Sequence, residues 1–217
     1  MARVDAQKKS LVATERDEAK RAVWREEITL IAEREPQRLK FIDESACHLS
    51  LTRLYGWARR NERCVYALPG NSGTRQSMVA LFSLSGAIEQ YRVQKGALTG
   101  ADFACFVQEL VVPNLSAGDV VVLDNARCHR VKRVRELIES VGARVLFLPA
   151  YSPDFSPIEL AWRKVKASLR EAEARTQEQL LPAIDAAMQG VTVEDAQAFY
   201  VHCGYGTPTK FDAALQS

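Results

Sequence analysis

Hydrophobic and polar positions change their period along this chain, most clearly in its middle. Residues 120–123 form a short apolar run rich in valine, which is typical of a strand buried on both faces. Apolar side chains then recur at helical spacing over residues 131–141, Gly142 marks a stop, and a second apolar run covers residues 145–148. This order predicts a βαβ unit whose two parallel strands end at the same edge of a sheet.

The pattern predicts further strands and helices around that unit. Residues 39–42 predict a first strand, and residues 78–84 and 88–93 predict a hairpin, so the first three strands would form an antiparallel meander. Apolar periodicity predicts helices in the N-terminal 36 residues, over residues 103–111, from Pro157 onward, and over residues 176–189 and 192–201. Strands and helices interleaved in this way predict an α/β fold.

The composition is that of a globular protein with one good core. The chain has 217 residues, of which 47% are hydrophobic and 26% are charged. No apolar run approaches the roughly 20 residues of a membrane span, and the charged N-terminus lacks an apolar signal region. The five cysteines are an odd number without a paired CxxC spacing, so no disulfide framework is expected. We therefore expect a cytoplasmic protein without a membrane partner.

Three carboxylates lie where predicted elements end or begin. Asp43 follows the first strand, Asp124 follows residues 120–123, and Glu159 falls in the first turn of the helix that begins at Pro157. Oxygen ligands of this kind suit Mg²⁺ or Mn²⁺, and two such ions about 3.5 to 4 Å apart can assist phosphodiester chemistry. Taken singly, each residue also has a structural interpretation. The aspartates are common turn formers, and Glu159 could complete a capping box with Ser156.

Three segments carry a family resemblance: FIDES at residues 41–45, LDNARCH at residues 123–129 and LPAYSPDFSPIELAW at residues 148–162. Together they resemble the signature segments of mariner-related bacterial insertion-sequence transposases. The gap between Asp124 and Glu159, residues 125–158, also resembles the spacing of that superfamily's DDE triad.

The resemblance implies both a fold and an activity. The implied fold is ribonuclease H-like, with a mixed sheet flanked by helices, and the implied metal ligands and catalytic residues are Asp43, Asp124 and Glu159. Asn125 and His129 match the family pattern and would support the ligands or the structure. The implied activity is that of a Mg²⁺-dependent DNA endonuclease and strand transferase, with two Mg²⁺ or Mn²⁺ ions. It would act in DNA recombination at the ends of an insertion sequence, near the bacterial nucleoid.

The resemblance also implies a domain organisation and partners. Residues 1–36 are expected to be a helical arm or linker remnant, residues 37–205 the DDE catalytic domain, and residues 206–217 a C-terminal tail. Full-length relatives carry helix-turn-helix units ahead of the catalytic domain. The expected partners are double-stranded DNA, a second copy in the DNA complex, and a separate helix-turn-helix subunit or full-length transposase. The alternative is a truncated, non-catalytic regulator of such a transposase.

Basic residues gather after two of the three carboxylates, which could hold phosphate groups or could be solvated helix faces. They are Arg127, Arg130, Lys132, Arg133, Arg135, Arg163, Lys164, Lys166 and Arg170.

Three adjacent Cys/His pairs raise a zinc-binding alternative: Cys47-His48, Cys128-His129 and His202-Cys203. We expect no zinc module, because neighbouring side chains seldom face one ion and the usual C-x₂₋₄-C spacing is missing. For Cys128 and His129 in particular, the two side chains are expected to diverge at the start of a helix.

Overall fold

A mixed five-stranded sheet forms the centre of the protein, in a computed structural model that describes residues 13–53, 55–68 and 70–206. The strand order is β3-β2-β1-β4-β5. The first three strands pair antiparallel, whereas β4 and β5 run parallel to β1, so the predicted meander and the parallel pair are both confirmed. The strands are β1 (Leu39–Cys47), β2 (Gln76–Ser83), β3 (Ala87–Lys95), β4 (Val120–Leu123) and β5 (Arg144–Phe147).

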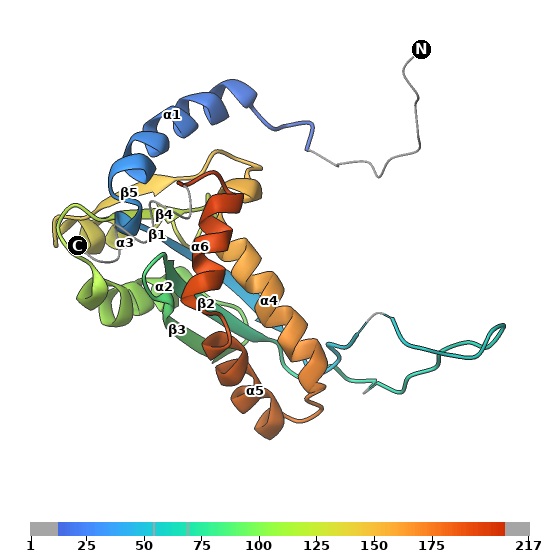
Figure 1. Ribbon diagram of the computed structural model, residues 1–217. Helices are drawn as coiled ribbons and strands as arrows, with labels where there is room; N and C mark the ends of the chain where they lie inside the picture. The colour runs from blue at the N-terminus through green and yellow to red at the C-terminus, as the bar shows by residue number, and fades with distance from the viewer. Residues whose placement is uncertain (1–12, 54, 69, 207–217) are drawn as a thin grey trace, which may run out of the picture.

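Helices cover both faces of the sheet (Figure 1). One face carries α1 (Glu18–Arg34), α4 (Pro157–Ala172), α5 (Gln177–Gln189) and α6 (Val193–His202), and the other carries α2 (Gly100–Phe106) and α3 (Lys132–Glu139). The chain of α2 continues as a π-helical turn (Val107–Val111) and a short 3₁₀ turn (Val112–Asn114). Two further 3₁₀ turns are Pro36–Arg38 and Pro153–Phe155. Each helix predicted from periodicity is present.

Two separate apolar clusters lie against the two faces because side chains alternate along each strand. In β4, Val120 and Val122 join the cluster beneath α4, whereas Val121 and Leu123 join the cluster beneath α2 and α3. All four are buried, as the apolar run predicted. The arm helix α1 belongs to the first cluster, because Trp24 and other apolar residues of its inner face pack there.

Strand β1 is longer than the sequence predicted. The prediction ended the strand at Ile42, but β1 runs to Cys47 because β2 continues to pair with it, from Asp43 opposite Ala80 to Cys47 opposite Gln76. The parallel pairing with β4 does end early, at Ile42 opposite Leu123. Asp43 therefore lies where one neighbour of β1 stops and the other continues.

The segment between β1 and β2 extends away from the sheet (Figure 1). It carries basic and aromatic side chains that face solvent, and among them Tyr55 and Trp57 are almost fully exposed. Among the helices of the described part of the chain, none combines the length and apolar character that crossing a bilayer requires.

Candidate active site

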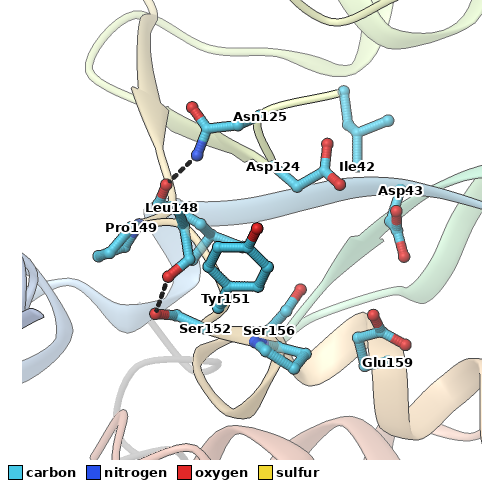
Figure 2. Close-up of a pocket in the computed structure, with 12 residues that line it drawn as sticks. Ile42, Asp43, Asp124, Asn125, Leu148, Pro149, Tyr151, Ser152, Ser156 and Glu159 are labelled. Carbon is cyan, nitrogen blue, oxygen red and sulfur yellow. Dashed lines mark hydrogen bonds between the residues drawn. The ribbon is translucent and has the colours of Figure 1, made fainter. Parts of the chain in front are cut away.

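The three predicted carboxylates meet in one pocket at the edge where β4 ends (Figure 2). Asp43, Asp124 and Glu159 come from β1, from the residue after β4, and from the first turn of α4. The other residues that line the pocket are Ile42, Asn125, Leu148, Pro149, Ala150, Tyr151, Ser152, Pro153 and Ser156. Residues separated by more than a hundred positions are thus brought together as the sequence predicted.

Strand register brings the two aspartates side by side. Ile42 and Leu123 are the last Cα partners of the parallel β1–β4 pair, so Asp43 and Asp124 occupy the next position on each strand. Parallel strands present their carboxyl ends at one edge, which is where open α/β sheets place their sites.

The side chain of Asp43 is held by a hydrogen bond from helix α4. Because it alternates with Ile42, its side chain faces α4, where the indole Nε1 of Trp162 donates a hydrogen bond to its Oδ2 at 3.2 Å. Burial raises the pKa of Asp43 to about 7, and the nearby carboxylates of Glu159 and Asp124 add to the rise. A cation between these carboxylates would relieve the repulsion.

Glu159 is free of the capping role that the sequence left open. Ser156 occupies the N-cap position of α4, but its side chain makes no capping hydrogen bond, and its backbone N–H donates to the carbonyl of Pro153 instead. Real capping boxes do form in this chain at α2, with Thr99 and Asp102, and at α6. The capping-box alternative for Glu159 is therefore wrong, and its carboxylate lines the pocket.

Asp124 is held from behind by a buried histidine. Nδ1 of His129 lies 2.5 Å from Oδ1 of Asp124, and Nε2 lies 2.8 Å from Oε2 of Glu44. Burial disfavours a charge on this ring, but the contacts with Asp124, Cys128 and Glu44 outweigh it and raise the pKa of His129 to about 12. Burial likewise opposes the charge of Asp124, yet His129 and the backbone N–H of Ala126 lower the pKa of that carboxyl group.

Asn125 points away from the three carboxylates (Figure 2). Its Nδ2 donates to the carbonyl of Leu148 at 2.5 Å, and its Oδ1 accepts from Arg130 at 2.5 Å. These bonds tie the end of β4 to the end of β5, so the contacts of Asn125 are structural.

Two residues near the pocket were not assigned a role from the sequence. Trp162 was predicted only as part of the core stripe of α4, although its position three residues after Glu159 places both on one helix face. Glu44 was seen only as a strand end, although its alternation with Asp43 turns it toward His129. The expected divergence of Cys128 and His129 is wrong, because both side chains approach Glu44.

The basic residues that follow the carboxylates differ in their contacts. Lys132, Arg135 and Lys164 form ion pairs with acidic residues of helices, which agrees with the solvated-face interpretation. Arg127 and Arg163, which follow Asp124 and Glu159 in the sequence, are both exposed to solvent. Their side chains are therefore available to a polyanion.

The donor set of the pocket fits a hard divalent cation. Three carboxylates line it, and no Lys, Arg or His stands among its described lining residues to neutralise them. Mg²⁺ and Mn²⁺ prefer such oxygen ligands, whereas zinc favours nitrogen and sulfur.

The chain belongs to the DDE superfamily endonuclease family, whose profile matches residues 38–181. No curated protein matches the sequence. Among solved structures, the chain is similar to the Mos1 strand transfer complex, with 19% identity and a TM-score of 0.70, covering 100% of this chain and 66% of that chain.

Other Mos1 structures give the same result. The mariner Mos1 paired end complex with Mg matches at 18% identity and a TM-score of 0.70, covering 100% of this chain and 67% of the other. The catalytic domain of Mos1 mariner transposase matches at 16% identity and a TM-score of 0.60, covering 95% and 97%. The chain thus spans about two thirds of the longer Mos1 chains, and the predicted ribonuclease H-like fold is confirmed.

Proposed function

We propose that this chain is the catalytic domain of a transposase, which cuts DNA at the ends of an insertion sequence and joins the freed ends to a target. The observation that supports this most is the convergence of Asp43, Asp124 and Glu159 on one pocket without a cationic side chain in its lining. Burial and the neighbouring carboxylates of Glu159 and Asp124 raise the pKa of Asp43, so its charge is costly in the folded protein, and a site for cations explains its retention.

Asp43, Asp124 and Glu159 are proposed as the ligands of two Mg²⁺ or Mn²⁺ ions. When bound, a pair of such ions activates the attacking oxygen and stabilises the leaving oxygen of a phosphodiester. Solved Mos1 complexes with Mg and with Mn carry the same fold, which supports this choice of ions.

The protein's own contribution is to hold the ligands in place. Trp162 fixes one oxygen of Asp43 through its indole N–H. His129 fixes Asp124 from the opposite side, and its position between two carboxylates keeps the ring charged.

Double-stranded DNA is the proposed substrate, in the form of element ends and target. A second copy of the chain is the proposed partner in the DNA complex, since the Mos1 structures of this fold include a paired-end complex. A helix-turn-helix subunit or a full-length transposase would supply recognition of the ends. The proposed location is the cytoplasm, at the nucleoid.

The decisive experiment is a cleavage assay on duplex DNA that carries the neighbouring element ends, with and without Mg²⁺, and with the full-length partner added. Wild type is compared with Asp43→Asn, Asp124→Asn and Glu159→Gln, and Asp185→Asn serves as a control at an exposed helix position. We expect Mg²⁺-dependent cleavage by wild type and the control only. Equal cleavage by the triad variants would overturn the proposal. If wild type does not cleave under any of these conditions, the result would favour the alternative, a truncated, non-catalytic regulator of a full-length transposase.

A further inference from the structure

A second group of metal-binding side chains lies behind the pocket. Oε1 of Glu44 is 3.1 Å from Sγ of Cys128, and Oε2 of Glu44 is 2.8 Å from Nε2 of His129. The three donor atoms all lie within 4.8 Å of one another. They come from β1 and from the turn after β4, so the close approach depends on the fold.

The histidine of this group is arranged as a metal-bound histidine is. Its side chain is fully buried, and neither ring nitrogen makes a hydrogen bond of good geometry, despite the short distances. One nitrogen, Nδ1, faces the carboxylate of Asp124, which leaves Nε2 facing Glu44. Metal-binding histidines commonly have their second nitrogen held by a carboxylate in this way, which fixes the ring's orientation.

We propose that Glu44, Cys128 and His129 form a binding site for a thiophilic divalent cation of the zinc class. A thiolate, an imidazole and a carboxylate are the donors that such ions take, and tetrahedral bond lengths place these donors about 3.5 Å apart. The donor atoms lie within 4.8 Å of one another, so small side-chain movements bring them to that spacing. Water fills the fourth position, and the half-buried Cys128 gives solvent access.

Binding exchanges two protons for the ion. The thiol of Cys128 and Nε2 of His129 each lose a proton to solvent, and each then donates a lone pair to the cation, while Nδ1–H still faces Asp124. No electron is transferred. Because Mg²⁺ avoids sulfur and nitrogen, excess Mg²⁺ does not compete for this group.

Cadmium provides a direct probe, since its bond to a thiolate absorbs in the ultraviolet. Cd²⁺ is titrated into the whole protein in excess Mg²⁺, with wild type, Cys128→Ser and Cys105→Ser compared. Cys105 is a matched control, because its Sγ also lies 3.1 Å from a glutamate oxygen, that of Glu109, but has no histidine beside it. We expect one tight equivalent in wild type and Cys105→Ser, with affinity at least tenfold weaker in Cys128→Ser.

A second variant covers the case in which Cys128→Ser does not fold. Glu44→Gln keeps the thiol and the imidazole but removes the carboxylate, so we expect it to retain the absorption band with a weaker affinity. Zn²⁺ should raise the melting temperature of wild type and Cys105→Ser but not of Cys128→Ser. Tight binding that survives in Cys128→Ser, that disappears in Cys105→Ser, or that is missing in wild type would overturn the proposal. None of these readouts requires DNA cleavage, so they stand apart from the proposed function.

Discussion

Trp162 donates a hydrogen bond from its indole nitrogen to a carboxylate oxygen of Asp43, at 3.2 Å across 119 positions of the chain. The bond joins the face of α4 that carries Glu159 to the strand that carries Asp43. The other carboxylate oxygen of Asp43 is left free to face the pocket. One face of α4 therefore orients both carboxylates, that of Glu159 directly and that of Asp43 through Trp162.

Trp162→Phe tests that relationship. Phenylalanine keeps most of the buried apolar area but removes the N–H, so we expect a folded protein, destabilised by about 1–3 kcal/mol, whose Mg²⁺-dependent cleavage falls at least about tenfold. The control is Trp24→Phe in the same apolar cluster, because Nε1 of Trp24 has no hydrogen-bond partner. Melting temperature and cleavage are measured on the same preparations. Equal loss of cleavage in both variants would mean that Trp162 acts only through packing.

Glu159→Gln should fold and be nearly inactive. The change removes only a charge–helix dipole interaction of about 0.3 to 1 kcal/mol, whereas a loss of about 4 kcal/mol in the transition state lowers a rate roughly a thousandfold. Ser156→Ala is the matched control, and we expect it to cleave normally and to lose little stability, because its hydroxyl makes no capping bond. Normal cleavage by Glu159→Gln would remove Glu159 from the triad.

Asp43→Asn and Asp124→Asn should change the stability of the metal-free protein in opposite directions. At pH 8 Asp43 is a half-buried anion next to Glu159 and Asp124, so its neutralisation should raise the melting temperature. Asp124 is the counter-ion of buried His129, so neutralising Asp124 should lower the melting temperature. In both variants Mg²⁺ and Mn²⁺ should no longer raise the melting temperature. The site assignment fails if either variant keeps the full metal effect.

Arg21 and Asp154 should make stability depend on acid pH. Arg21 is only 5% exposed, and its guanidinium donates two hydrogen bonds to Asp154, at 3.0 and 2.6 Å. Partial burial opposes the charge of Asp154, but Arg21 outweighs it and lowers the pKa of that carboxyl group. The stabilisation is thus present above the unfolded pKa, about 3.9, and is lost as the pH falls through the lower folded value.

The variant Asp154→Asn should therefore melt earlier than wild type at pH 7, because it leaves Arg21 buried with a weaker partner. The difference in melting temperature should shrink below about pH 4, where wild type also loses the carboxylate charge. A difference that stays constant down to pH 2 would assign the effect to packing instead of charge.

DNA binding should be largely independent of sequence and should weaken steeply with salt, because phosphate contacts release counterions. Arg127→Gln with Arg163→Gln should reduce the slope of log affinity against log salt. The control is Lys132→Gln, because Lys132 is paired with Glu136 on its own helix. Fluorescence anisotropy measures all three proteins. A strong preference for one duplex, or an unchanged slope in the double variant, would contradict this prediction.

The sequence by itself determined the order of elements and singled out the three carboxylates that the fold brings into one pocket. Strands and helices can be predicted from local patterns, because burial and the period of each element set the spacing of its apolar residues. Examples are the apolar run at residues 120–123 and the apolar stripe of α4. Three signature segments also pointed to the family that the profile match then established.

Only the tertiary structure decided where β1 ends, whether Glu159 caps its helix, and what Glu44, Cys128, His129 and Trp162 contact. The length of β1 depends on its partner β2, and the capping bond depends on the backbone geometry of Ser156. The contacts of Glu44 and Trp162 join residues far apart in the chain, 84 positions for Glu44 and Cys128 and 119 for Trp162 and Asp43. Such pairs are set by strand register and helix packing, which no local pattern of residues specifies.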